Sequence, residues 1–502
     1  MKLPYLHTGS RLTAMTDRVG GLCLTEAYTG GRLESGLHLS FDDYPGLGVR
    51  KPPRTVETYE DPQALFAGQR LLVIQSGRVR WGENDLGQVA EGPKQLAAVN
   101  KYILIFPDKK YVDTEAGVLG EMEVSCTVEG AAFSGGTVSA EDTAWPFRVG
   151  DAVAIEGCRS VPANNRTLIV RQAEAGVLTF DDNAFEPAEE ASVTLTRKVP
   201  DLEVVCESGN RLWGCAGNTI YGSKLGDPLN FFVYDGLSTD SYALAVSGEE
   251  PFTGCAPYGS YILFFREQTA HKLYGTRPAN YQLMTVHIPG VRRGAAATLW
   301  NDSEVLYYLG AQGVYAYGGG VPELLSADLG PITGDYPCGG AWMGKYYLSA
   351  CVGGREGIYT FDARLQGWLP WGEGSALSMA VQDGMLHLLM ADGALLAASG
   401  GQDREDWMAA FRPLRDGTGR NSRCTSFAID ASPAPGAWFA VEIRSGEGTW
   451  QRIALFDSRV QGPRPVRLPP NRGMRLQIRL VGHGPCRIRS IERRFRMGSD
   501  IS

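Results

Sequence analysis

The residue types that most often do chemistry are few in this chain and widely separated. Its six histidines stand at positions 7, 38, 271, 287, 387 and 483. None has the H-x-x-x-H or H-E-x-x-H spacing that places two metal ligands on one face. His271 and His387 fall inside predicted strands, so we interpret them as core or loop residues. The pattern predicts no metal site.

Motifs for nucleophilic or phosphate chemistry are also missing. The sequence has no G-x-S-x-G elbow to present a serine and no G-x-x-x-x-G-K-[ST] loop to cradle a phosphate. Asp42 with Asp43, and Asp181 with Asp182, are neighbours in predicted loops. Carboxylates that cleave a glycosidic bond must instead flank that bond. We therefore expect no catalytic residues, no cofactor and no enzymatic activity.

Ten cysteines are scattered along the chain without a C-x-x-C pair. The first fifteen residues, MKLPYLHTGSRLTAM, lack the apolar region of a secretory signal, so we expect the cysteines to be reduced core residues. No run approaches about eighteen consecutive apolar residues, the length that a spanning helix needs. We expect no membrane span.

A short pattern recurs between residues 63 and 399: a small or polar turn residue, an aromatic and aliphatic strand, a Gly or Asp turn, and a second strand. A period near forty residues with about four strands per unit is typical of a β-propeller, because short strands bury a face only by stacking sheets. The sequence predicts an all-β fold, a six- or seven-bladed β-propeller over residues 61–116 and 201–400. Copies begin at Gly68, Asn100, Asn210, Gly259, Asp302, Gly344 and Gly384, and the last four steps are 49, 43, 42 and 40 residues.

The period breaks once, between Asn100 and Asn210, a step of 110 residues. Within it, residues 117–200 alternate short apolar runs with Gly, Asp and Asn turns and carry thirteen acids against six bases. We predict an inserted small β domain here, since propeller loops tolerate insertions. A simpler alternative is an elaborated pair of strands.

The two ends of the chain depart from the repeat. Residues 1–60 are rich in Gly and Pro, and Pro45, Pro52 and Pro53 predict an extended, strand-poor N-terminal arm, which could still supply a strand that closes the last blade. Residues 411–502 alternate apolar residues with arginines, which predicts an Arg-rich C-terminal β-sandwich. The polar linker 399–413 could hold a short helix.

Charge is distributed unevenly along the chain. Residues 411–502 hold seventeen arginines, no lysine and seven acids, a net charge of +10, although the whole chain carries −8. Arginine binds carboxylate and phosphate bidentately, so this region could dock on an acidic neighbour or face nucleic acid; a solvated β face is the third explanation. The candidate interface residues are Arg464, Arg467, Arg472, Arg475, Arg479, Arg487, Arg489, Arg493, Arg494 and Arg496, together with Arg50, Lys51 and Arg54.

One stretch of the propeller region, residues 210–275, has a distinctive order. A strand ends in Ser and Lys, and a Gly-Asp turn and an aromatic run follow. This order resembles a segment of bacteriophage tail nozzle or packaged-DNA stabilisation (tail hub) proteins of short-tailed phages, and residues 40–54 and 484–500 are similar to the opening arm and the sandwich ending of that family. The matching residues are Ser223, Lys224, Gly226, Asp227, Phe231, Phe232, Ser238, Thr239 and Asp240.

The resemblance implies a structural role in a virion tail. Such proteins form a homo-oligomeric ring, commonly a hexamer, that continues the DNA channel from portal and adaptor and retains the packaged genome. The implied partners are the phage portal-adaptor, the tail tip or fibre proteins, and double-stranded DNA that passes through the lumen without sequence-specific contacts. Assembly would occur in the bacterial host cytoplasm.

Two other function classes remain open from the sequence. A glycan- or receptor-binding β-propeller would stack exposed aromatic rings on sugars, and a glycosidase would need converging acids. Tryptophans more often fill propeller cores than bind sugars. The candidates for stacking are Trp213, Trp300, Trp342, Trp368 and Trp371.

Overall fold

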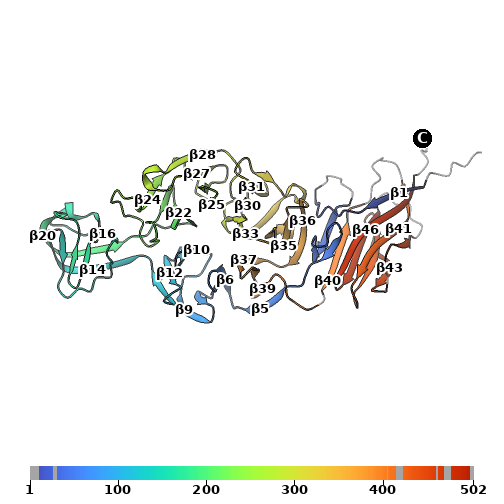
Figure 1. The fold of residues 1–502 in the computed structure, drawn as a ribbon, viewed down its shortest axis with the longest axis horizontal. Helices are drawn as coiled ribbons and strands as arrows, with labels where there is room; N and C mark the ends of the chain where they lie inside the picture. Colours follow the sequence, from blue (N-terminus) through green and yellow to red (C-terminus); the bar gives the residue numbers. More distant parts are fainter. Residues whose placement is uncertain are drawn as a thin grey trace, which may run out of the picture. The chain divides into compact units, whose positions relative to one another are not determined.

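The structure is a computed structural model that describes residues 11–25, 31–302, 304–403, 405–413, 422–459, 462–468 and 476–497. Its elements are β-strands and four short 3-10 turns, and the described residues contain no α-helix (Figure 1). None of their helical turns is long and apolar enough to cross a membrane. Two compact units are present: Met1–Tyr59, Gln312–Tyr315 and Leu324–Ser502 form unit 1, and Glu60–Ala311 and Ala316–Glu323 form unit 2.

Seven four-stranded antiparallel sheets of the described residues make up the propeller, and the predicted all-β propeller class is confirmed. In each sheet the predicted repeat supplies the second and third strands. The first sheet of unit 2 consists of β6(Pro62–Ala67), β7(Leu71–Gln75), β8(Arg78–Trp81) and β9(Asn84–Gln88). The second consists of β10(Gln95–Val99), β11(Tyr102–Phe106), β12(Lys110–Asp113) and β13(Val118–Glu121). Unit 2 also holds β21(Val204–Ser208), β22(Arg211–Ala216), β23(Thr219–Gly222) and β24(Tyr242–Ala245), then β25(Gly254–Tyr258), β26(Tyr261–Phe265), β27(Ala270–Tyr274) and β28(Gln282–Val286).

The remaining sheets follow in chain order. One consists of β29(Trp300–Asp302), β30(Val305–Leu309), β31(Val314–Tyr317) and β32(Glu323–Leu324). In unit 1, the next consists of β33(Ile332–Trp342), β34(Lys345–Val352), β35(Arg355–Asp362) and β36(Gly367–Glu373), and the last begins with β37(Ala376–Gln382), β38(Met385–Met390) and β39(Ala394–Ala397). The 3-10 turns are η1(Pro162–Asn164), η2(Pro278–Asn280), η3(Ala296–Thr298) and η4(Ala327–Leu329).

The backbone conformation of the turn that opens most repeats explains why a small or polar residue recurs there in the sequence. Asn100 and Asn210 have φ of 54° and 60°, and Gly259, Gly344 and Gly384 have φ of 54°, 70° and 73°. Only Gly, and to a lesser degree Asn, adopts this left-handed region readily. A tight hairpin between the first two strands therefore requires these residue types.

The N-terminal segment is richer in strands than the sequence predicts. β5(Arg54–Thr58) pairs with β39 and completes the last propeller sheet. β1(Arg11–Thr16), β2(Leu33–Leu37), β3(Leu39–Ser40) and β4(Leu47–Val49) join the sheets of the C-terminal domain. The prediction of a strand-poor arm is wrong, because Pro52 and Pro53 precede β5 and lie outside any strand, where a missing amide costs no ladder hydrogen bond.

The C-terminal domain consists of two sheets, in agreement with the predicted sandwich. It begins with β40(Asp406–Phe411), so the expected helix in residues 399–413 is wrong; Trp407, Ala409 and Ala410 are buried along this strand. One sheet has the order β2-β40-β45-β42-β43, and the other has the order β3-β4-β46-β41-β44 with β1 on β46. The strands are β41(Ser422–Pro433), β42(Trp438–Ser445), β43(Gln451–Asp457), β44(Arg464–Arg467), β45(Leu476–His483) and β46(Cys486–Met497).

The inserted region of unit 2 is a separate seven-stranded sheet with its own core, as an inserted domain requires. Phe133, Phe180 and Phe185 pack edge to face inside it, and Val153 and Leu195 are fully buried. The strand order is β17-β16-β20-β14-β15-β19-β18. The strands are β14(Val124–Gly135), β15(Thr137–Ser139), β16(Ala152–Glu156), β17(Thr167–Ile169), β18(Gln172–Glu174), β19(Val177–Thr179) and β20(Phe185–Arg197).

Candidate functional site

A buried polar network fixes the inserted domain to the loop 223–241 of unit 2, which joins β23 to β24. Arg197 at the end of β20 donates to an Asp151 carboxylate oxygen at 3.0 Å and to the Met122 carbonyl at 3.0 and 3.2 Å. The amide of Asn230, in the loop, donates to the other Asp151 oxygen at 2.9 Å, and its carbonyl accepts from the Ala152 amide at 3.1 Å. Because every charge here is paired, the network can be buried at the junction.

The rest of this loop is stabilised by hydrogen bonds between its own backbone and two side chains, those of Arg211 and Asp240. Arg211, 1% exposed, donates to the carbonyls of Ser223, Ser238 and Asp240 at 2.6, 3.0 and 2.5 Å. One carboxylate oxygen of Asp240 accepts from the amides of Gly236 and Leu237. Three of the residues that carry the sequence resemblance, Ser223, Ser238 and Asp240, thus take part in the hydrogen bonds that fix the path of this loop.

Several C-terminal arginines pair with acids of the same domain. Arg479 on β45 donates to Glu442 on β42 at 2.9 Å, and Glu442 is only 8% exposed. Arg489 on β46 donates to Asp430 at 2.7 Å, and Arg494 donates to Glu492 at 3.0 Å. Arg479 also lies over the Trp450 ring, 4.5 Å from its centroid, and Arg493 lies 5.1 Å from the Phe495 ring centroid. These contacts stabilise the sandwich itself.

Other arginines remain available at the surface. Arg464 and Arg467 on β44 and Arg487 on β46 are exposed, and no ion pair engages them among the residues that the structure describes. The predicted alternation is present on β46, where Cys486 and Ile488 are buried and Arg487 is exposed. Arg472 and Arg475 lie outside the described residues, as does the side chain of Arg496.

The three N-terminal candidates differ from one another. Arg50 is 7% exposed; it donates to the Trp371 carbonyl and to Glu405 at 3.1 Å, and it stacks 4.4 Å from the Trp371 ring centroid. Burial lowers the pKa of Arg50, and Glu405 opposes this shift. Lys51 and Arg54 are exposed. Arg50 therefore serves the interior of unit 1, and of these three only Lys51 and Arg54 present their charge to solvent.

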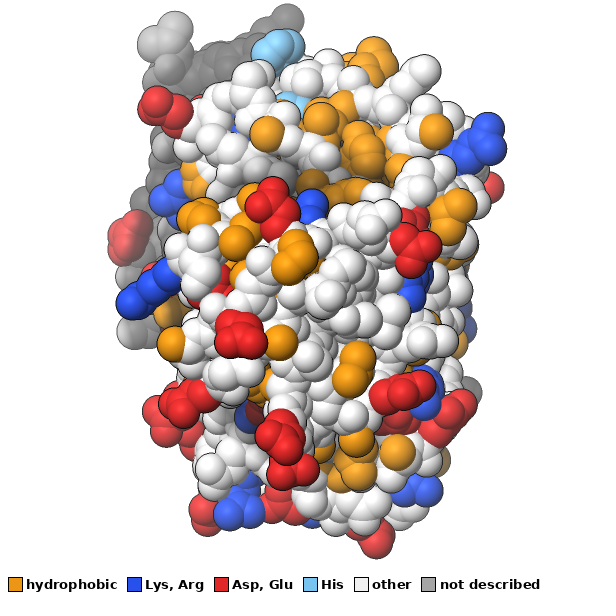
Figure 2. All heavy atoms as spheres, turned by 90° about the vertical axis from the view of Figure 1, so that its left-hand side faces the viewer, with side chains coloured by type: hydrophobic (Ala, Val, Ile, Leu, Met, Phe, Trp, Pro, Cys, Tyr) orange, Lys and Arg blue, Asp and Glu red, His pale blue; other side chains and the backbone are white. Residues whose placement is uncertain are grey.

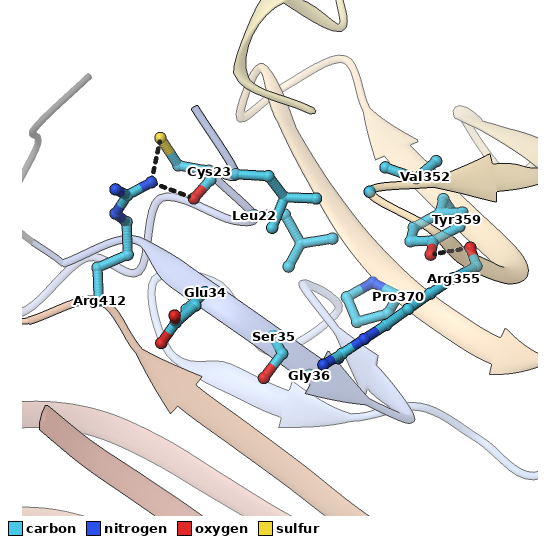
Figure 3. A pocket seen from close by; sticks show the side chains of 12 residues that line it. Leu22, Cys23, Glu34, Ser35, Gly36, Val352, Arg355, Tyr359, Pro370 and Arg412 are labelled. Atoms are coloured by element: carbon cyan, nitrogen blue, oxygen red, sulfur yellow. Dashed lines mark hydrogen bonds between the residues drawn. The ribbon is translucent and has the colours of Figure 1, made fainter. Parts of the chain in front are cut away.

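A pocket of about 340 Å³ lies in unit 1 beside β2 (Figure 3). Leu22, Leu24 and Val352 line it with apolar surface, and the guanidinium groups of Arg355 and Arg412 lie on opposite sides. Arg412 donates to the Cys23 carbonyl at 2.6 Å and to the Thr25 carbonyl. Sequence reasoning missed both arginines, because one follows a hairpin turn and the other follows β40, and no spacing links them.

A second pocket, of about 320 Å³, lies beside the segment 39–51. Lys345 occupies one wall and donates to Asp42 at 2.5 Å, and Lys51, Trp342 and Met343 also line it. Two cations that line this pocket are thus paired with acids of the same chain, Lys345 with Asp42 and Arg50 with Glu405.

The tryptophans considered for sugar stacking lie mainly in the core. Trp213, Trp368 and Trp371 are 1%, 2% and 6% exposed and cannot present a face to a ligand. Trp342 and Trp300 are half-buried, and the Trp342 indole donates to the Gly384 carbonyl at 2.8 Å. The aromatic residues are therefore mostly used for packing between strands.

No protein-family model matches the chain, and no curated protein matches it. Among solved structures it is similar to BamB from Moraxella catarrhalis, at 11% identity and a TM-score of 0.36 over 70% of this chain and 97% of that chain. It is also similar to Hsv2 of Kluyveromyces lactis, at 9% identity and a TM-score of 0.32 over 71% and 94% of the two chains. The all-β propeller class of this protein follows from its own sheets.

Proposed function

We propose that the protein is a structural subunit of a phage tail. In this proposal, copies form a ring, the nozzle or hub, at the end of a short tail, continue the DNA channel and retain the packaged genome. The support is the loop 223–241. Asp227, one of the residues through which the sequence resembles the nozzle family, accepts a hydrogen bond from the Asn230 amide at 2.7 Å, and Asn230 in turn bonds to Asp151 of the inserted domain.

Charge supplies a way for copies to associate. Residues 117–200 carry thirteen acids and six bases, and residues 411–502 carry a net charge of +10. Figure 2, viewed from the side where β14, β16 and β20 lie in Figure 1, shows acidic side chains dispersed over that face. Contacts between unlike surfaces are heterologous, and they close into a ring when the rotation between copies permits.

The exposed arginines would then meet protein acids rather than line the channel. Each phosphate contact strengthens salt-sensitive binding to DNA, and many such contacts would oppose sliding of the genome. Arg479, Arg489 and Arg494 already pair with acids of the protein, which is consistent with arginines of this domain binding carboxylates rather than DNA phosphates. The expected neighbours in the virion are portal-adaptor proteins and tail tip or fibre proteins.

Electron microscopy of intact particles labelled with antibodies against this chain tests the proposal. We expect label at the tail end, and class averages that show several copies around a pore. Label elsewhere on the particle, or a chain absent from purified particles, would contradict it. Light scattering on the purified 54.4 kDa chain would add the number of copies that associate without a template.

A further inference from the structure

The pocket beside β2 presents two positive charges that its own acids do not neutralise. Among the described residues, neither Arg355 nor Arg412 has an ion-pair partner. Glu34, the one acid that lines the pocket, lies 3.7 Å from Arg444 and accepts a hydrogen bond from Gln477. Asp328, which lies near Cys23, is paired with Arg32. The pocket is therefore cationic with apolar walls, a combination that suits a carboxylate carried on a carbon stem.

The floor of the pocket is an open strand edge. On this side of β2, Leu33 donates to the Gly21 carbonyl at 2.8 Å and accepts from the Cys23 amide at 2.9 Å. Residues 34–36 follow, and β40 is their only strand partner among the described residues. Figure 3 shows Glu34, Ser35 and Gly36 along this edge, with Leu22 across the pocket from them. An extended peptide can add to such an edge through main-chain hydrogen bonds.

We propose that this pocket binds an extended acidic segment from the inserted domain of a second copy of the chain. The inserted domain offers exposed carboxylates on its loops, among them Glu141, Asp142 and Asp182, and another at Glu174, the last residue of β18. Arg355, which is exposed, would meet the incoming carboxylate first, and Arg412, held by two carbonyls, would fix its position. The inference rests on the proposed ring, since it needs a second copy.

Photo-cross-linking tests it on the full chain. A benzoylphenylalanine in place of Leu24, which is 36% exposed on the pocket wall, would be irradiated in assembled protein made from mixed heavy-isotope and light chains. We expect cross-linked peptides that join a heavy chain to residues 117–200 of a light chain. Arg355→Glu in the same protein should lower their yield at least about tenfold, because a buried charge pair is lost.

The matched control is Arg459→Glu, because the Arg459 side chain is 90% exposed and this residue is far in sequence from the pocket residues; the substitution should leave the yield unchanged. The same probe in place of the exposed Glu34, which also lines the pocket, covers the case in which the Leu24 variant does not fold. Cross-links within one chain, to another region or to another protein, or no cross-link in an assembled ring, would overturn the inference and leave the ring intact. A chain that forms no ring in solution or in particles would instead refute the proposed function.

Discussion

Arg197 and Asp151 form an ion pair at 3.0 Å in which the two side chains are only 5% and 4% exposed. The pair joins β20 to the start of β16, and Asn230 connects it to the loop 223–241. Desolvation makes a buried pair a weak source of net stability, but removing one partner leaves the other as an uncompensated charge. The inserted domain can therefore pack against the loop 223–241 in this way only while both charges of the pair are present.

Asp151→Ala should release the inserted domain at a cost of about 3–5 kcal/mol, because Arg197 would remain buried without its carboxylate. Hydrogen exchange measures this by faster exchange in residues 124–197 than in the propeller strands. Lys198→Ala is the control, since its pair with Glu156 has side chains 45% and 59% exposed. That loss should cost at most about 1 kcal/mol. Equal exchange in the two variants would contradict the role of the buried pair.

Closure of the last propeller sheet by β5 depends on a glycine. Gly393 has φ of 98°, and a Cβ there would lie 2.1 Å from the Tyr59 carbonyl oxygen. Gly393→Ala should destabilise unit 1 by several kcal/mol, since backbone must move and a left-handed residue is strained by about 1–3 kcal/mol. Thermal unfolding followed by circular dichroism measures the loss.

Gly400→Ala separates the two causes. Gly400 has φ of 104°, and a Cβ there meets nothing within 4 Å, so only the backbone strain applies. We expect the Gly393 variant to be clearly less stable than the Gly400 variant. Similar melting temperatures would show that the contact between Gly393 and Tyr59 does not limit the fold.

His271 gives the propeller a pH dependence. It is 3% exposed, its Nδ1 is 2.9 Å from the Thr285 hydroxyl, and burial, aided by Arg266, lowers its pKa to about 4. The unfolded chain, with a pKa near 6.5, binds the proton first, so this contribution is fully present above about pH 6.5 and is lost as pH falls towards about 4.

Denaturant unfolding at pH 7 and pH 5 measures this contribution. His271→Gln should reduce the loss of stability between the two values by about 2 kcal/mol, because glutamine does not titrate. The exposed His287→Gln is the control and should change the difference little. An unchanged pH difference in the His271 variant would show that another group dominates.

The sequence predicted the propeller sheets well because most repeats contain their own turn signal. Asn100, Asn210 and the glycines at 259, 344 and 384 all have positive φ in the structure. The sequence allowed a closing strand from the N-terminal residues, and β5 is that strand, but local signals could not predict its register on β39 or the pairing of β2 with β40. Such pairings join segments far apart in sequence, and short strands fit several partners equally well.

The candidate interface was predicted only as a pattern. Alternation on β46 correctly separated exposed Arg487 from buried Ile488, since side chains alternate between faces. It could not separate Arg479, which pairs with Glu442, from Arg464, because the acid comes from another strand. For the same reason, nothing local identified Arg355 and Arg412 as neighbours across a pocket.

Exposed and paired arginines of the C-terminal domain should respond differently to charge reversal. Arg464→Glu with Arg487→Glu should change the free energy of unfolding by about 0.5 kcal/mol or less, as exposed substitutions do, and should weaken self-association. Arg479→Ala should destabilise the domain by about 2–4 kcal/mol, because Glu442 stays buried without its main partner. Analytical ultracentrifugation at two salt concentrations measures association, which should also weaken with salt.

A DNA-binding assay on the Arg464→Glu, Arg487→Glu protein separates the remaining explanations for the arginines. If this protein assembles normally but binds duplex DNA less tightly, Arg464 and Arg487 face nucleic acid. If assembly and DNA binding are both unchanged, they belong to a solvated face. Loss of assembly with unchanged DNA binding is the outcome that we expect, because no described acid of the C-terminal domain pairs with Arg464 or Arg487, and residues 117–200 carry an excess of acids.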